Sequence, residues 1–299
     1  YYDQGAKLFW LDVAEPEYSV YDFKNYRYQL GSVQEVGNIY PKYYLKAFYD
    51  GMTAEGDTMP ISLIRSAWAG SAKYGALVWS GDIVSTFECF RRQVQAGLNM
   101  AIAGIPWWTT DIGGFHGART DDPDFHRLYI RWFEYGCFCP VMRLHGNRNP
   151  QEGYGAEQIG SGSDNEIWSF GDKAYEISKK YIFLRERLRD YIRTQMKKAH
   201  EDGTPMMRPV FYDFPTDQES WNVEDAYLFG PDLYVAPVME DHVTEREVYL
   251  PDGTAWFNAW TGEKYEGGQN VTVAAPLDTI PVFVKEGADA EKLLNIFSE

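Results

Sequence analysis

The stretch GALVWSGD at residues 75–82 decides the fold prediction, because an apolar run ends there in a turn and an aspartate. A second run, KLFWLD at residues 7–12, also ends in an aspartate. Asp12 and Asp82 are 70 positions apart (82 − 12), close to two strand–helix units of a (β/α)8 barrel at roughly 30 residues per unit. The runs therefore predict two parallel strands that hold both aspartates on one face. Taken singly, each aspartate is more simply explained as the end of a strand and the cap of the next helix.

Short apolar runs alternate with amphipathic stretches from the start of the 299-residue chain to about residue 205. This is the pattern of parallel strands joined by helices. Strands are predicted at residues 7–11, 60–66, 75–80, 101–107 and 137–143, and helices at residues 43–52, 87–99, 125–135 and 173–201. The last helix is the clearest, because its apolar residues recur every three or four positions. The fold class is therefore α/β, with about five strands of a TIM barrel.

The pattern changes after residue 212 to short strand-like runs separated by Gly, Pro and Asp, among them AYLFGPDLYVAPV and REVYLPDGTAWFNAW. Such runs are typical of antiparallel sheet. We therefore expect two domains, the barrel part at residues 1–212 and a small antiparallel β-sandwich at residues 213–299.

The composition narrows the class of partner. The formal net charge of −16 repels polyanions and so argues against nucleic acid and against an anionic membrane surface. Aromatic residues make up 16% of the chain, including 10 Trp and 22 Tyr, and their flat faces suit stacking on sugar rings, although core packing accounts for most of them.

Location is predicted from three weaker signals. No apolar run approaches the roughly 20 residues of a membrane span, and the N-terminal residues lack the layout of a signal peptide. The three cysteines, Cys89, Cys137 and Cys139, have no zinc-site spacing and fit reduced core residues. We expect a cytoplasmic protein, with secretion still open because the chain does not begin with Met and its true start is expected upstream.

Further polar side chains follow the predicted strands. Arg65 stands in LIRSAWAG, Trp79 in VWSGD, Asp111 in GIPWWTTDIGGF, and Arg143 and His145 in PVMRLHGNR. Taken one at a time, Arg65 fits a structural ion pair, His145 a core histidine, and Trp107 and Trp108 core packing. Charged or hydrogen-bonding groups at successive strand ends are, however, how barrel enzymes build an active site.

The segments FWLDVAEPE at residues 9–17 and WSGDI at residues 79–83 resemble glycoside hydrolase family 31, the retaining α-glycosidases. The resemblance runs over nearly the whole chain. It implies that Asp12 is the nucleophile and Asp82 the acid/base. It also implies a sugar-binding set of Arg65, Trp79, Asp111 and His145, with Trp10, Trp107 and Phe115 as apolar walls. No metal or organic cofactor is expected, because a carboxylate pair performs this chemistry unaided.

The implied activity is release of terminal non-reducing α-linked glucose or xylose from an oligosaccharide, with retention through a covalent glycosyl-enzyme intermediate. Transglycosylation through the same intermediate is the nearest alternative, and an inactive fragment that only binds sugar is another. No GxSxG elbow, HExxH motif, P-loop or dinucleotide fingerprint supports a different enzyme class.

The chain departs from the family pattern at two points. The common nucleophile segment continues with Met-Asn-Glu, whereas Val13 and Ala14 precede Glu15 here, so the preferred sugar cannot be read from it. The nucleophile strand is normally the fourth of the barrel, so the chain is expected to hold about the last five strands. The N-terminal part of the same enzyme is an expected partner, and an oligomer is possible.

Overall fold

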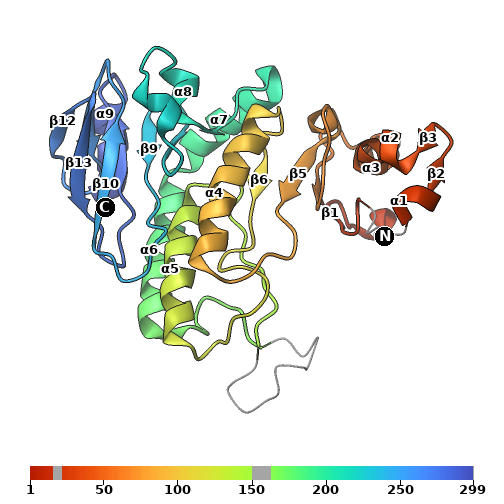
Figure 1. Cartoon of the computed structure of the whole chain (residues 1–299), viewed down its shortest axis with the longest axis horizontal. Coiled ribbons are helices and arrows are strands. Elements are labelled where there is room, and N and C mark those ends of the chain that lie inside the picture. The colour runs from red at the N-terminus through yellow and green to blue at the C-terminus, as the bar shows by residue number, and fades with distance from the viewer. Residues whose placement is uncertain (16–21, 150–162, 299) are drawn as a thin grey trace.

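The computed structural model describes residues 1–15, 22–149 and 163–298. Figure 1 shows a parallel sheet and the N-terminal segment at one end of the molecule, helices in the middle, and a β-domain at the other end. The last two residues of the segment FWLDVAEPE, Pro16 and Glu17, lie outside the described residues.

The parallel sheet contains four strands in the order β1 (Phe9–Leu11), β4 (Ser62–Ile64), β5 (Ala76–Trp79) and β6 (Trp108–Thr109). Leu11 is paired with Ile64, which is paired in turn with Val78. Neighbours in the sheet follow one another along the chain, as they do in a barrel, and the prediction of a partial TIM barrel is confirmed.

Two of the predicted strands were placed wrongly. The run at residues 101–107 begins inside helix α4 (Phe87–Ile102), and its strand, β6, starts only at Trp108. Alanine and methionine favour helix, so the apolar residues before Gly104 extend α4.

The run at residues 137–143 is not a strand, because Cys137 ends helix α5 (Pro123–Cys137) and Pro140, which follows, has no N–H to donate. The chain nevertheless runs beside β6, where the Val141 N–H donates to the Trp108 carbonyl over 3.2 Å.

The helices around this sheet follow the predicted ones. Helix α3 (Tyr40–Ala54), α4 and α5 lie where helices were expected. The single helix predicted at residues 173–201 is two helices, α6 (Gly171–Arg187) and α7 (Arg189–Asp202), separated at Leu188. Gly203 ends α7 at φ 79°, a conformation that glycine adopts without a steric penalty.

Smaller elements complete the N-terminal half and the junction with the β-domain. They are η1 (Tyr2–Gln4), α1 (Asp22–Asn25), β2 (Arg27–Tyr28), β3 (Gly31–Ser32), α2 (Val33–Val36), η2 (Gly37–Ile39), η3 (Ser71–Tyr74), α8 (Val210–Asp213) and η4 (Glu219–Asn222).

The β-domain has two antiparallel sheets. The larger one has the order β12 (Lys264–Glu266), β11 (Ala255–Asn258), β14 (Val282–Lys285), β9 (Leu233–Val235), β8 (Tyr227–Phe229), β7 (Met207–Arg208), and the smaller one pairs β10 (Glu245–Leu250) with β13 (Gln269–Ala274). A separate core that includes Val248, Val271 and Trp256 joins them. The prediction of a β-sandwich is confirmed, and a C-terminal helix, α9 (Ala290–Ser298), was not foreseen.

One buried side chain ties the β-domain to the barrel part. Arg131 on α5 donates to four main-chain carbonyls of the β-domain, among them Ala275 at 2.6 Å and Pro276 at 3.0 Å. It also pairs with Glu134, whose full burial raises the pKa of that carboxyl to about 8.

None of the helices in the described part of the chain has the length and apolar character needed to cross a membrane.

Candidate active site

Four residues of the predicted site follow the four parallel strands. Asp12 comes directly after β1, Arg65 after β4, Asp82 three residues after β5, and Asp111 two residues after β6. Neighbouring parallel strands have their carboxyl ends at one edge of the sheet, which is where barrel enzymes carry their catalytic groups. We call this the carboxyl edge of the sheet.

Arg65 holds the Asp12 carboxylate from one side. Its Nη1 lies 3.3 Å from Asp12 Oδ1, and its Nη2 lies 2.6 Å from Glu15 Oε1. The Val13 N–H donates to the same Asp12 oxygen over 2.9 Å. Val13 has φ 52°, a strained value for a β-branched residue and one often found near active sites. The Asp12 side chain is still 44% exposed, so its carboxylate is oriented but accessible.

Asp82 lies on a loop that is fastened to the next one. The Ile83 carbonyl accepts from the Phe115 N–H at 2.7 Å and from the His116 N–H at 3.0 Å. His116 Nε2 is 4.0 Å from Asp82 Oδ2, and both side chains are about half exposed. Asp82 is therefore carried by an anchored main chain while its carboxyl faces open space.

Asp111 differs from the other two aspartates in being fully buried. It forms an ion pair with Arg143 through Oδ1. Burial, with a smaller contribution from the charge of Asp82, raises its pKa to about 6 against the opposing effect of Arg143. Its second oxygen, Oδ2, is buried and has no hydrogen-bond partner among the described residues. A buried carboxylate oxygen of this kind is suited to accept a substrate hydroxyl.

Aromatic side chains of the predicted site are in contact with one another and with His145. Trp10 makes edge contacts with Trp79 at 5.9 Å and with His145 at 5.3 Å between ring centroids, and Phe115 stacks on His145 at 5.4 Å. Burial lowers the pKa of His145, as does the charge of Arg143, whereas Asp82 and Asp12 oppose this effect. His145 is therefore close enough to both predicted catalytic carboxylates to respond to their charge.

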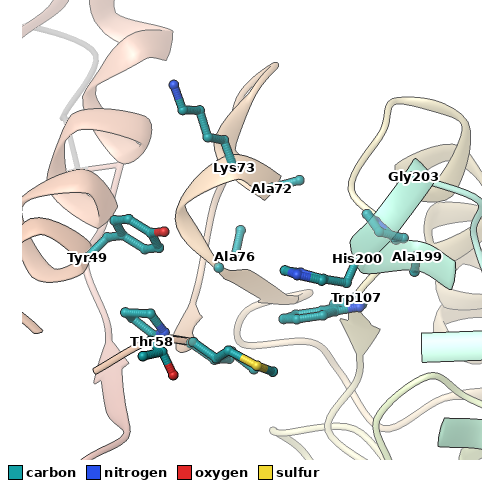
Figure 2. Close-up of a pocket in the computed structure, with 14 residues that line it drawn as sticks. Tyr49, Thr58, Ala72, Lys73, Ala76, Trp107, Ala199, His200 and Gly203 are labelled. Carbon is teal, nitrogen blue, oxygen red and sulfur yellow. The ribbon is translucent and has the colours of Figure 1, made fainter. Parts of the chain in front are cut away.

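The structure does not place Trp107 with the other predicted residues. Trp107 precedes β6 and lines a cavity of about 330 Å³ at the opposite, amino-terminal edge of the sheet. Pro60 and Gly75, which precede β4 and β5, line the same cavity. Figure 2 shows the Trp107 ring next to His200 from the end of α7. Of the other eight predicted residues, Trp10 and Trp79 lie in the last two residues of their strands, and five follow the carboxyl end of a strand. The eighth, His145, contacts Trp10 and Phe115.

Sequence reasoning missed three features of the site. Glu15 shares Arg65 with Asp12, His116 approaches Asp82, and Val13 has a left-handed backbone. Glu15 is part of the segment FWLDVAEPE and His116 follows the predicted Phe115, so their positions in the sequence could have indicated them, whereas nothing in the sequence indicates the φ of Val13.

No group of three or more His, Cys, Asp or Glu residues that could hold a metal ion is found within residues 1–15, 22–149 and 163–298.

Known proteins match both parts of the chain. The model of the glycosyl hydrolases family 31 TIM-barrel domain matches residues 1–195, and that of the glycosyl hydrolase family 31 C-terminal domain matches residues 203–288. A solved GH31 alpha-xylosidase from a soil metagenome, complexed with xylose, is 56% identical with a TM-score of 0.92, over 98% of this chain and 44% of that one.

Two relatives extend this comparison. An alpha-xylosidase of Saccharolobus solfataricus is 36% identical over 96% of this chain and 38% of its own length. Alpha-glucosidase 2 of Bacillus thermoamyloliquefaciens is 33% identical over 96% of this chain and 35% of its own length. The chain thus spans less than half the length of these relatives. Because the barrel-domain model covers most of the chain and the C-terminal model covers most of the rest, the chain belongs to glycosyl hydrolase family 31.

Proposed function

We propose that this chain provides the catalytic carboxylates of a retaining α-glycosidase that releases terminal non-reducing α-linked xylose or glucose from oligosaccharides. The observation that carries the proposal is the pair of accessible carboxylates at one sheet edge, Asp12 after β1 and Asp82 after β5, with Arg65 between them. Two carboxyl groups that flank the scissile bond are what this reaction needs.

The environments of the two aspartates support different roles. Asp12 is held by a cation and a main-chain N–H, which orient its carboxylate for the role of nucleophile. Asp82 faces His116 at 4.0 Å and makes no closer ion pair in the described part of the chain, which leaves its carboxyl available for proton transfer. We assign Asp82 as the acid that protonates the leaving oxygen and the base that later activates water.

The remaining residues bind the sugar in this proposal. Asp111, with its unpartnered Oδ2, accepts a sugar hydroxyl, and Trp10, Trp79 and Phe115 supply apolar surface. Xylose is placed before glucose because alpha-xylosidases are among the most similar relatives.

The location that we propose is the cytoplasm. The three cysteines are free, which favours a reducing compartment. Cell fractionation tests that location.

We also propose that further barrel strands complete the site. Among the described residues β1 pairs only with β4, and a parallel strand with one free edge is open to another strand. Trp10 and Leu8 are 54% and 65% exposed there. The proposed activity is therefore assayed in the protein expressed from its full reading frame, with this chain alone as a comparison.

The stereochemistry of the product tests the mechanism. Proton NMR during hydrolysis of an aryl α-xyloside or α-glucoside is expected to show the α-anomer first. Initial formation of the β-anomer would mean inversion and would contradict the nucleophile assignment. Adding a sugar acceptor at high concentration separates the two fates of the intermediate, because a transglycosylase forms a new glycoside where a hydrolase releases free sugar.

A further inference from the structure

Arg148 is a buried cation without a carboxylate partner among the described residues. Its side chain is among the largest that are fully buried, with 1% exposure. The guanidinium donates to three neutral oxygens at short range: Asn165 Oδ1 at 2.8 Å, the Gly114 carbonyl at 2.6 Å and the Ile112 carbonyl at 3.0 Å. A longer contact of 3.4 Å reaches Ser85 Oγ. Burying a charge without an opposite charge is costly, so the site needs a reason to keep it.

Three of the four groups that Arg148 contacts, all except Asn165, belong to the loops that carry the site. Ser85 is on the loop of Asp82, three residues farther along. Ile112 and Gly114 lie between Asp111 and Phe115 on the loop after β6. Arg148 itself follows His145 by three residues. One side chain thus connects the main-chain segments of the acid/base, of the buried aspartate and of the histidine.

Main-chain hydrogen bonds and a close backbone approach join these loops directly to one another. The Ser85 N–H donates to the His116 carbonyl at 2.8 Å, and the Asn147 N–H donates to the Phe115 carbonyl at 2.9 Å. A Cβ on Gly114, which has φ 79°, would lie 2.7 Å from Ser85 Cα. The loops therefore touch backbone to backbone at Gly114, and the Gly114 carbonyl accepts from Arg148 at the same place.

The charge of Arg148 also reaches the site. It lowers the pKa of His145 and opposes the rise in the pKa of Asp111, while burial lowers the pKa of Arg148 itself to about 10. A neutral side chain of the same length could satisfy some of the same carbonyls but would remove this field.

We propose that Arg148 is a positioning residue for catalysis, which holds the Asp82 loop against the loop of Asp111 and Phe115 so that the acid meets the leaving oxygen. The proposal rests on the function proposed above. It adds a residue that touches no substrate and acts through Asp82. Misplacement of a catalytic group by about 1 Å can cost about 10²-fold in rate, which sets the expected scale.

The test compares leaving groups in the full-length enzyme. Arg148→Gln is expected to lower kcat/KM for a methyl glycoside or disaccharide about 10- to 100-fold more than for a nitrophenyl glycoside, because only the poor leaving group depends on a well-placed acid. Arg148→Lys keeps the charge but replaces the planar guanidinium fork with a compact ammonium group. It is expected to recover part of the loss.

A matched control is available on helix α6. Arg185 is partly buried and donates to the carbonyls of Cys137, Cys139 and Pro140 at 2.6 to 2.9 Å, away from the loops of Asp82 and Asp111. Arg185→Gln is expected to lower the melting temperature and to change kcat/KM by the same factor for both leaving groups. A purely structural Arg148 would behave like this control.

Asp82→Ala in the same series separates the two proposals. If Asp82→Ala loses more kcat/KM with the poor leaving group than with the good one and Arg148→Gln loses the same with both, the positioning role is overturned and the proposed function stands. If neither discriminates, the assignment of Asp82 as the acid fails, and the positioning role fails with it. Failure of both Arg148 variants to fold, as judged by circular dichroism, would also overturn the positioning role in favour of a structural one.

Discussion

The two edges of one parallel sheet differ sharply in chemistry. The carboxyl edge holds Asp12, Arg65 and Asp111 in ion pairs, and the rings of Trp10 and Trp79 are in contact there. The amino-terminal edge holds Pro60, Trp107 and other largely apolar residues around a cavity of about 330 Å³. The carboxyl edge brings charged groups together and the amino-terminal edge surrounds a largely apolar cavity, and that contrast in lining separates a candidate reaction site from a packing gap.

The largest expected effect at the carboxyl edge comes from Asp12. Asp12→Ala in the full-length enzyme should lower kcat by more than about 10⁴-fold for every leaving group, because removing a covalent nucleophile costs on this scale. Steady-state assays with aryl glycosides measure the loss. Retention of more than a few percent of the wild-type activity would remove Asp12 from the mechanism.

The second prediction concerns the other carboxylate of this edge. Asp82→Ala should reduce kcat/KM for substrates with poor leaving groups by roughly 10²- to 10⁴-fold and for activated aryl glycosides far less. A series of aryl glycosides with graded leaving groups measures the slope. An equal loss across the series would reject Asp82 as the acid.

The third prediction uses the buried aspartate of the same edge. Its folded pKa of about 6 lies above the usual value of 3.8, so the folded state binds the proton more tightly than the unfolded state. The contribution of the protonated Asp111 to the free energy of unfolding is fully present below pH 4 and is lost as the pH rises through 6. Asp111→Asn lacks this titration. The free energy of unfolding of wild type relative to Asp111→Asn should fall by up to about 3 kcal/mol between pH 4 and 7.

Denaturant titrations at several pH values provide this comparison. Asp213→Asn is a suitable control, because Asp213 also pairs with an arginine, Arg208, but lies on α8, away from the carboxyl edge of the sheet. A constant difference between wild type and Asp111→Asn across the pH range would contradict the buried state of Asp111.

The smallest effect compares one tryptophan from each edge. Trp10 is 54% exposed beside His145, so Trp10→Ala should shift the ratio of kcat/KM for xyloside and glucoside by more than about tenfold, the scale of a pocket contact. Trp107→Ala should leave this ratio unchanged and affect only stability. A shift in Trp107→Ala without one in Trp10→Ala would reverse the assignment of the two edges.

The strand ends could be predicted because a charged residue stands just after each apolar run. Asp12, Arg65 and Asp82 follow runs that are strands in the structure, and one sheet edge then brings them together. The β-sandwich was predictable for a similar reason, since its turns are marked by Gly, Pro and Asp.

The wrong predictions arose where periodicity is ambiguous or where contacts are tertiary. An apolar run such as the one before Trp108 fits the end of a helix as well as a strand. Because β6 begins only at Trp108, Trp107 precedes the strand and lies at the amino-terminal edge. The positive φ of Val13 and the shared use of Arg65 by Asp12 and Glu15 depend on three-dimensional packing. The same holds for the loop contacts of Arg148, whose partners are distant in sequence.

Covalent labelling tests the central claim most directly. A fluorinated α-glycoside that forms a long-lived glycosyl-enzyme is incubated with the full-length enzyme, and the labelled peptide is identified by mass spectrometry. The account predicts one sugar attached to the peptide that contains Asp12, and no label in Asp12→Ala. A label on Asp82 or Asp111, or an enzyme that hydrolyses its substrate without any covalent adduct, would contradict it.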